Sequence, residues 1–224
     1  PLDLSLRQNV ERVLGVVLHN GYGLTETSPT ISRTLYAVGS NEVNIGTPIP
    51  GVEIKVVGSD GCEIMDGSPG ELHVRGPNVM LGYFRQPELT EAVIDKDGYL
   101  NTGDVVSVNS KQEMVVQGRT KELIIRSGFN VYPPEIEAAL NTHPAVLNSA
   151  VVGRSIEGNE EIIAFVEPVP GCHIEIDALF ALLDEHLARY KKPQKIIVMP
   201  QLPIAPNGKI RKNDLKKYAE TLPS

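Results

Sequence analysis

Glycine and proline recur every few residues between Gly39 and Gly118, and this punctuation confines the stretch to short strands joined by turns. The short segments between them, such as residues 52–57 and 71–75, alternate or cluster β-branched residues, which favour strands. We therefore expect an all-β region here, folded as a small distorted barrel or as twisted sheets.

The pattern changes after Arg119, where predicted strands alternate with predicted helices. Pro134 can occupy the first turn of one helix, and Asp177 can cap a second. Four residues of the second helix share an apolar face: Leu179, Leu182, Leu183 and Leu187. Strands are expected at residues 149–152, 161–166 and 195–199. This order of elements predicts a small α+β domain.

The segment before the glycine-rich region combines a helix and a strand. Residues 6–14 place their apolar side chains on one helical face, and residues 16–18 read as a short apolar strand. Because the pattern of predicted strands and helices changes at residues 118–121, we predict two domains, residues 1–120 and 121–224.

The charge balance argues against nucleic acid as a partner. The chain carries 21 basic and 28 acidic side chains, a net charge of −7, and its overall field repels phosphate backbones. No apolar run reaches the roughly 20 residues of a spanning helix, so no membrane span is expected. Cys62 and Cys172 lack a CxxC spacing, which predicts inert buried thiols in a cytoplasmic protein. Pro1 stands where a start methionine would, so a longer parent is expected.

The first chemical motif is NGYGLTE at residues 20–26. Its glycines let a ligand approach the backbone, and Tyr22 offers a flat face to a base. Thr25 can donate to a phosphate oxygen, and Glu26 can hold Mg²⁺. These parts suit a nucleotide. The alternative is a tight turn with a solvated glutamate, since the segment lacks the GxGxxG pattern.

The second motif is YLNTGD at residues 99–104. Asp104 can accept paired hydrogen bonds from the two hydroxyls of a ribose, and the alternative is a loop aspartate that caps backbone amides. An EF-hand beginning at Asp95 is excluded, because Leu100 and Val106 stand where that loop needs Gly and Glu. The neighbouring residues 95–98 are better interpreted as a hairpin turn.

Two further motifs lie at and beyond the domain boundary. Arg119 can fork onto a ribose or phosphate, and the glycine-containing residues 127–129 can let a narrow ligand pass, or form a surface turn. Asn207 and Gly208 predict a tight hairpin that holds Lys209 at its tip. A lysine there can bridge two anions, although most exposed lysines have no chemical role.

Hydrolase motifs are missing from the sequence. The five histidines form no HExxH or other ligand-spaced pair, and no GxSxG elbow is present. Metal hydrolysis and serine hydrolysis are therefore excluded as interpretations.

Taken in order, five segments resemble the back portion of the adenylate-forming (ANL) superfamily of acyl-CoA synthetases, luciferases and peptide-synthetase adenylation domains. The resemblance spans essentially the whole chain. The segments are residues 21–26, 70–76 with 82–83, 102–104, 118–121 and 207–209. The resemblance implies an α+β chain: the end of an α/β subdomain, a β-rich distorted barrel subdomain, and a small mobile α+β C-terminal domain.

The resemblance implies a two-step reaction that uses ATP, Mg²⁺ and coenzyme A. A carboxylate attacks the α-phosphate to give an acyl-adenylate and pyrophosphate, and a thiol then displaces AMP. Catalysis is assigned to Thr25, Glu26 and Lys209, with Glu26 as the metal ligand. The implied nucleotide-binding residues are Asn20, Gly21, Tyr22, Gly23, Thr25, Asp104, Arg119 and Lys209.

The resemblance also implies a hinge and a thiol tunnel. Lys121 matches the hinge position of the mobile domain, and Ser127, Gly128 and Phe129 match the loop that lines the CoA tunnel. The run at residues 127–133 is similar to CoA ligases rather than to peptide-synthetase domains.

We therefore expect a fragment of an AMP-forming acyl-CoA synthetase, an acid-thiol ligase. No Pro-Lys-Gly or GxxxxGK phosphate loop is present, so the fragment alone should be inactive. Fatty and aryl acids are both open as substrates, with fatty acids favoured, and the oligomeric state is open. The alternatives are an adenylation enzyme that serves a carrier protein or oxygen, and a non-catalytic nucleotide-binding or partner-docking module.

Overall fold

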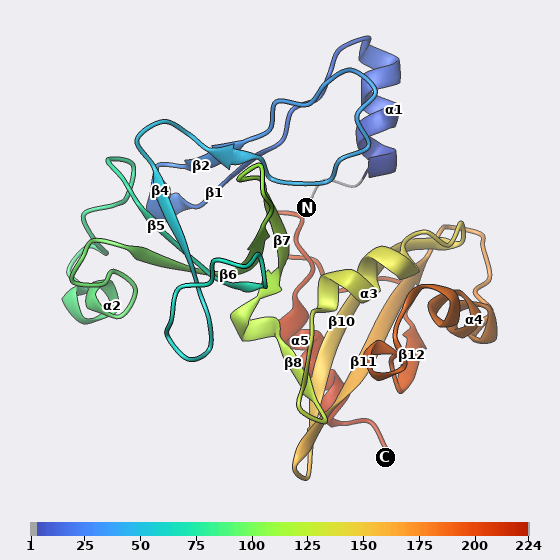
Figure 1. The fold of residues 1–224 in the computed structure, drawn as a ribbon. Helices are drawn as coiled ribbons and strands as arrows, with labels where there is room; N and C mark the ends of the chain where they lie inside the picture. The colour runs from blue at the N-terminus through green and yellow to red at the C-terminus, as the bar shows by residue number, and fades with distance from the viewer. Residues whose placement is uncertain (1–3, 224) are drawn as a thin grey trace. The chain divides into compact units, whose positions relative to one another are not determined.

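The computed structural model describes residues 4–223, and the chain divides into two compact units, Pro1–Thr120 and Lys121–Ser224 (Figure 1). Each unit has its own sheets and its own hydrophobic core. The division falls within residues 118–121, where the sequence pattern changes.

The first unit begins with a helix and a small antiparallel sheet. The elements are α1 (Leu4–Leu14), β1 (Gly21–Gly23), the 3-10 turn η1 (Thr25–Thr27), β2 (Thr30–Arg33) and β3 (Thr47–Pro48), with the sheet order β1-β2-β3.

The outcome of the predictions for this segment is mixed. The helix predicted at residues 6–14 is confirmed as α1. The strand predicted at residues 16–18 is wrong, because the Leu18 amide donates to the Glu11 carboxylate (3.0 Å) and not to a neighbouring strand. The first strand is instead β1, within the NGYGLTE motif.

The larger sheet of the first unit is antiparallel throughout. Its order is β4 (Glu53–Val57), β5 (Gly70–Arg75), β6 (Leu100–Val108) and β7 (Met114–Arg119), and the short helix α2 (Pro87–Glu91) lies between β5 and β6 in the chain. The strands predicted at residues 52–57 and 71–75 are confirmed as β4 and β5. Leu72 and Val74 are fully buried, at the spacing of two that a strand requires to cover a core.

The mixed α+β class is confirmed, but this sheet is open, so the predicted distorted barrel is wrong for the described residues. Both edges of the sheet are occupied by other segments of the same unit. The amide of Ile64 donates to the carbonyl of Val56 (2.7 Å) at the edge of β4. The amide of Ile45 donates to the carbonyl of Met114 (2.8 Å) at the edge of β7. These bonds satisfy edge groups that barrel closure would need.

The second unit is built on a three-stranded sheet preceded by a hairpin. The sheet has the order β10 (Val146–Ile156), β11 (Asn159–Pro168) and β12 (Lys195–Val198), and the hairpin joins β8 (Ile124–Arg126) to β9 (Phe129–Val131). The helices are α3 (Pro133–Leu140), α4 (Ile176–His186) and α5 (Lys212–Glu220), and 3-10 turns form η2 (Thr120–Glu122) and η3 (Arg189–Lys191).

Both faces of the three-stranded sheet are covered by helices (Figure 1), which explains the unbroken apolar run of β11. Alternate residues of a strand point to opposite faces. Ile162 and Val166 pack with α3 and α4, whereas Ile163 and Phe165 pack with Leu215 of α5. The strands predicted at residues 149–152 and 161–166 are confirmed within β10 and β11, and the strand predicted at residues 195–199 is confirmed as β12, which ends at Val198.

Both helices predicted for the second unit are confirmed as α3 and α4, but one cap is misplaced. Pro134 lies in the first turn of α3, as predicted. The cap position of α4 is Glu175 rather than Asp177, and the helix begins at Ile176. Asp177 therefore lies in the first turn, where a carboxylate stabilises the positive end of a helix dipole.

The two cysteines are exposed, so the prediction of buried thiols is wrong. Each lies in a turn outside the cores. The amide of Cys62 donates to Asp60 Oδ1 (2.9 Å), and the amide of Cys172 donates to the carbonyl of Val169 (2.9 Å).

Candidate functional site

Three predicted residues, Tyr22, Asp104 and Arg119, form one connected group in the first unit, which we call the carboxylate cluster. Tyr22 Oη donates to Asp104 Oδ2 (2.5 Å), and Arg119 Nε donates to Asp104 Oδ1 (2.8 Å). Strands β6 and β7 place Asp104 directly opposite Arg119 in their antiparallel register. Strand β1 supplies Tyr22, whose ring packs against the core of this unit.

The carboxylate cluster has a buried anchor and an accessible end. The side chain of Asp104 is 7% exposed, and that of Arg119 is 56% exposed. Burial raises the pKa of Tyr22, and the charge of Asp104 and the hydrogen bond to it raise that pKa further. The phenol therefore remains a hydrogen-bond donor that holds the carboxylate in place.

Asp104 retains acceptor capacity within this cluster. A carboxylate offers about four lone-pair sites, and each oxygen of Asp104 accepts one of these two side-chain bonds. The alternative interpretation of Asp104 as a loop cap is wrong, because the residue lies in β6. Asp95 has the capping role instead, since its Oδ1 accepts from the amides of Asp97 (3.0 Å) and Tyr99 (2.8 Å). That turn is the hairpin predicted for residues 95–98.

The two glycines of β1 differ in their surroundings. A Cβ at Gly23 would lie 1.6 Å from the carbonyl oxygen of Pro29, so only glycine fits there. A Cβ at Gly21 would meet only the Ser32 carbonyl oxygen, at 3.9 Å. Gly23 is therefore required by its packing against the backbone of residues 29 and 30.

Thr25 and Glu26 form the start of η1. Thr25 is exposed and Glu26 is partly buried. Tyr83 Oη donates to Glu26 Oε1 (2.8 Å), and this hydrogen bond is the main cause that raises the pKa of Tyr83. Sequence reasoning gave Tyr83 no role of its own, although residues 82–83 belong to one of the resembling segments.

Asn20 fixes the entry to β1. Its amide donates to Thr34 Oγ1 (2.6 Å), and its carbonyl accepts from the Thr34 amide (2.8 Å). Its side-chain Nδ2 donates to the carbonyl of Asn44 (3.4 Å). The bonds of Asn20 within the described residues are therefore structural.

Lys209 lies at the tip of a tight turn in the second unit, as predicted. The amide of Gly208 donates to the carbonyl of Ala205 (2.9 Å), and the amide of Ala205 donates to the carbonyl of Lys209 (2.8 Å). Gly208 has a φ of 79°, which glycine adopts without strain. The Lys209 side chain is exposed on a backbone with fixed geometry.

The residues predicted to bind CoA form the turn between β8 and β9. Ser127 and Gly128 have φ values of 50° and 82°, the positive angles that a two-residue type I′ hairpin turn requires. Asn159 accepts a hydrogen bond from the Ser127 amide (2.7 Å). Phe129 stacks on Tyr190 with the ring centroids 4.7 Å apart. The turn is thus supported from two sides.

Lys121, the predicted hinge residue, is exposed within η2. No group of three or more His, Cys, Asp or Glu side chains suited to a metal occurs among residues 4–223. Within the same range, no helix combines the length and the apolar character needed to cross a bilayer.

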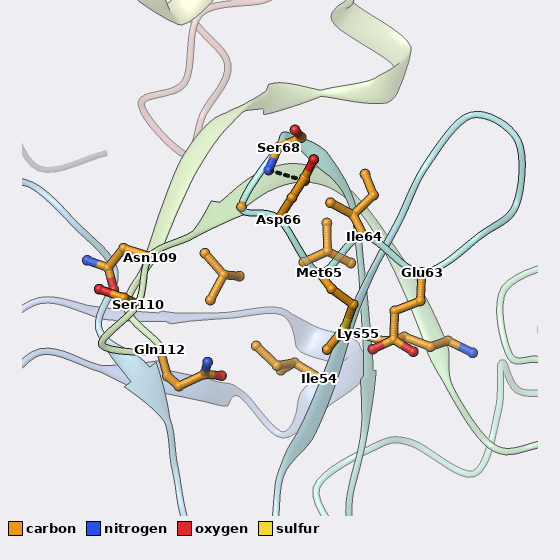
Figure 2. A pocket seen from close by; sticks show the side chains of 13 residues that line it. Ile54, Lys55, Glu63, Ile64, Met65, Asp66, Ser68, Asn109, Ser110 and Gln112 are labelled. Carbon is orange, nitrogen blue, oxygen red and sulfur yellow. Dashed lines mark hydrogen bonds between the residues drawn. The ribbon is translucent and has the colours of Figure 1, made fainter.

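A separate cavity of about 480 Å³ opens beside β4 and the turn after β6 (Figure 2). Apolar side chains such as Ile54 and Ile64 line part of it, and Asn109 and Gln112 line another part. None of the predicted site residues contributes to its lining. The cavity is therefore distinct from the carboxylate cluster.

Comparison with known families bears on both units. The family model described as AMP-binding enzyme matches residues 1–84, and that of the AMP-binding enzyme C-terminal domain matches residues 135–209. The chain belongs to the AMP-binding enzyme family. The matched ranges include Tyr22, Thr25 and Glu26 in the first unit and Lys209 in the second.

Curated relatives of this family member include CoA ligases from bacteria and plants. It is 35% identical to the long-chain-fatty-acid–CoA ligase of Escherichia coli O157:H7, over 98% of this chain and 39% of the relative. It is 36% identical to 4-coumarate–CoA ligase 1 of Oryza sativa subsp. japonica, over 93% of this chain and 38% of the relative. The chain thus spans about two fifths of the length of these relatives.

Solved structures agree with this membership. ATP-bound MatB from Rhodopseudomonas palustris matches with a TM-score of 0.89 and 33% identity, over 99% of this chain and 44% of that protein. The described fold is therefore that of the corresponding part of an adenylate-forming enzyme.

Proposed function

We propose that this chain is the C-terminal part of an enzyme that activates a carboxylic acid with ATP and transfers the acyl group to coenzyme A. In the first step, a carboxylate oxygen bonds to the α-phosphorus and the bond to the pyrophosphate group breaks. In the second step, the thiol sulfur bonds to the acyl carbon, AMP leaves, and the thiol proton is released. The carboxylate cluster, in a chain that matches both family models, is the observation that carries the proposal.

The carboxylate cluster is proposed to bind the nucleoside. Asp104 would accept from the ribose hydroxyls through its remaining lone pairs, and Arg119 would donate to a ribose or phosphate oxygen. Tyr22 holds the carboxylate through its phenol. It lies in the same strand as Gly21 and Gly23, which are proposed to approach the nucleotide. Its ring is proposed to lie near the base. Thr25 follows directly and is proposed to donate to the α-phosphate.

Glu26 is proposed to hold Mg²⁺. A single carboxylate fits the way Mg²⁺ is bound in nucleotide sites, since that ion takes one or two carboxylates together with substrate phosphates and waters. When bound, the ion supplies positive charge that offsets the charge of the phosphates. Tyr83 donates to one oxygen of Glu26 and thereby orients the carboxylate.

Lys209 is proposed to neutralise the two anions that react in the first step. Both the acid and the α-phosphate are negative, so a fixed cation between them stabilises the transition state. The tight turn at residues 205–209 fixes the backbone from which the ammonium reaches. Ser127, Gly128 and Phe129 are proposed to line the path of the CoA thiol, and Lys121 is proposed as the hinge of the mobile domain.

The experiment uses the full-length parent enzyme with ATP, coenzyme A, and a panel of fatty and aryl acids. We expect AMP and a CoA thioester to form in equal amounts with at least one acid. Asp104→Asn removes the charge that binds ribose, so kcat/KM for ATP should fall by about 100-fold. Asp60→Asn, at an exposed turn, is the matched control and should stay near the wild-type value.

Two outcomes would contradict the proposal. AMP formed without any CoA thioester would assign the acyl group to another acceptor, such as a carrier protein. If none of the acids causes ATP to be converted to AMP, the chain is better explained as part of a nucleotide-binding module without this activity.

A further inference from the structure

A partly buried cation in the second unit has no role in the function proposed above. Lys212 Nζ lies 2.6 Å from Glu122 Oε2 and 2.8 Å from Glu137 Oε1. We call these three residues the Lys212 triad. Their side chains are 22%, 34% and 16% exposed for Lys212, Glu122 and Glu137, so the ion pairs are largely shielded from water. Shielded pairs with short contacts are stronger than ordinary surface pairs.

The triad joins three separate parts of the chain. Lys212 is the first residue of α5 and lies three positions after Lys209. Glu122 ends η2 and directly follows Lys121. Glu137 belongs to α3, and its Oε1 also accepts from the amide of Val151 on β10 (2.8 Å). One ammonium therefore connects the end of the Lys209 turn, the residue after the proposed hinge, and the central sheet.

The two carboxylates depend on the same cation. Among residues 4–223, Lys212 is the only side-chain cation paired with Glu122 or Glu137. Burial lowers the pKa of Lys212, but the charges and hydrogen bonds of both glutamates outweigh it and raise that pKa overall. The ammonium thus remains charged at neutral pH, and it offsets the mutual repulsion of the two carboxylates.

The turn that presents Lys209 is held at its end by its own bonds and by Ile210, which packs against the buried cluster around Leu215. The amide of Arg211 donates to the carbonyl of Pro203 (2.8 Å), and Ile204 forms an isolated bridge with Ile210. These bonds close the turn on itself. The triad is the side-chain contact that fixes the closed turn to η2 and α3.

We propose that Lys212 is a positioning residue, which makes the Lys209 turn and the segment following residue 121 move as one rigid body. This inference rests on the proposed function for its catalytic consequence. Lys212 touches neither substrate nor reacting atoms. It sets where the Lys209 ammonium is held when the small domain adopts the pose for adenylation, and mispositioning by even about 1 Å is costly to catalysis.

The structural half of the proposal is tested on the 224-residue chain itself by amide hydrogen exchange. Lys212→Met keeps the length and apolar stem but removes the charge. We expect the amides of Ala205 and Gly208 to exchange about tenfold faster, while the amides of β11 keep their wild-type rates. Lys216→Met, at an exposed position of the same helix, is the control and should change neither set.

Lys212→Arg should restore slow exchange at the turn, because the guanidinium also donates to two carboxylates. Unchanged exchange at Ala205 and Gly208 in Lys212→Met would overturn the proposal. Equal acceleration of the turn and β11 would overturn it as well, because that result describes general destabilisation.

The catalytic half is tested in the full-length parent by pyrophosphate exchange. Lys212→Met should lower kcat about tenfold and leave KM for ATP within about twofold, since the nucleotide contacts lie elsewhere. Lys212→Arg should recover most of the rate. A change in KM alone would contradict a positioning role. A wild-type parent without any exchange activity would refute the proposed function, while the hydrogen-exchange result would still decide the structural coupling.

Discussion

At the scale of single residues, the phenol of Tyr22 is the group whose protonation reports on the carboxylate cluster. Burial and the adjacent Asp104 raise its pKa above the ordinary value near 10. Because the folded-state pKa is raised, the stability contributed by this phenol is fully present below the unfolded value. It is lost as the pH rises through the folded value.

Tyr22→Phe should therefore remove the phenol that resists ionisation. In an alkaline titration followed at 295 nm, wild type should show a fraction of its 7 tyrosines ionising only at very high pH, and the variant should lack one of them. The free energy of unfolding should fall by about 1 kcal/mol at neutral pH, because one hydrogen bond is lost. The variant lacks the absorbance increase that Tyr22 contributes in wild type. If that missing increase falls near pH 10, where ordinary tyrosines ionise, Tyr22 is not held by Asp104.

Gly23 and Gly21 offer a matched pair of substitutions in one strand. Gly23→Ala forces a Cβ against the backbone of Pro29, so we expect the free energy of unfolding to fall by about 3 kcal/mol. Gly21→Ala introduces only an ordinary contact and should cost less than about 1 kcal/mol. Urea denaturation measures both values. Equal losses would show that β1 does not pack against residue 29 in this way.

The sequence could predict single members of the site but not the bonds between them. Tyr22 and Asp104 lie 82 positions apart, and no local pattern reveals that the phenol donates to the carboxylate. The pairing of Asp104 with Arg119 depends on a register that a β-bulge between Val105 and Val106 alters. Tyr83 was missed because its contact with Glu26 also joins distant segments.

At the scale of secondary-structure elements, Arg154 ties two strands to the end of the chain. Its Nε donates to Glu161 Oε2 on β11 (2.9 Å), and its Nη1 donates to the carbonyl of Leu222 after α5 (3.0 Å). The arginine side chain is 5% exposed and that of Glu161 is 25% exposed. Removing one partner leaves the other charge poorly solvated.

Arg154→Met should accordingly lower the free energy of unfolding by about 3 kcal/mol, the lower end for broken buried pairs because Glu161 keeps some contact with water. Arg189→Met, at an exposed position of η3, is the control and should change stability by less than about 0.5 kcal/mol. Denaturant titration checks both. A loss below about 1 kcal/mol for Arg154→Met would show that the pair is solvated.

Elements with strong local signals were the ones the sequence could predict. The β-branched residues of β4, β10 and β11, the alternation of β5 and the apolar face of α4 are such signals. Strand β1 was not expected, because Gly-Tyr-Gly has low strand propensity and is held in place by its pairing with β2. The barrel prediction is wrong for a similar reason, since the pairing of Ile45 with Met114 at the edge of β7 joins segments far apart in the chain.

At the scale of the whole molecule, each of the three core clusters draws its residues from one unit. One cluster lies within residues 1–120, and two lie within residues 121–224, on opposite faces of the same sheet. A unit with its own core and both sheet faces covered meets the usual conditions for independent folding.

Residues 121–224 expressed alone should therefore fold cooperatively. We expect a single sigmoidal urea transition and dispersed amide resonances, with Phe165→Ala lowering stability by about 3–5 kcal/mol. A non-cooperative transition, or a Phe165→Ala variant as stable as wild type, would show that the core of this unit is not formed without the rest of the chain.

Lys209 is proposed to serve the first half-reaction of the parent enzyme and not the second. The decisive measurement compares wild type with Lys209→Ala in the two half-reactions separately: pyrophosphate exchange, and CoA thioester formation from supplied acyl-adenylate. We expect exchange to fall by at least about 100-fold and thioester formation to stay within about threefold of wild type. An equal loss in both half-reactions, or exchange at the wild-type rate, would contradict this role of Lys209.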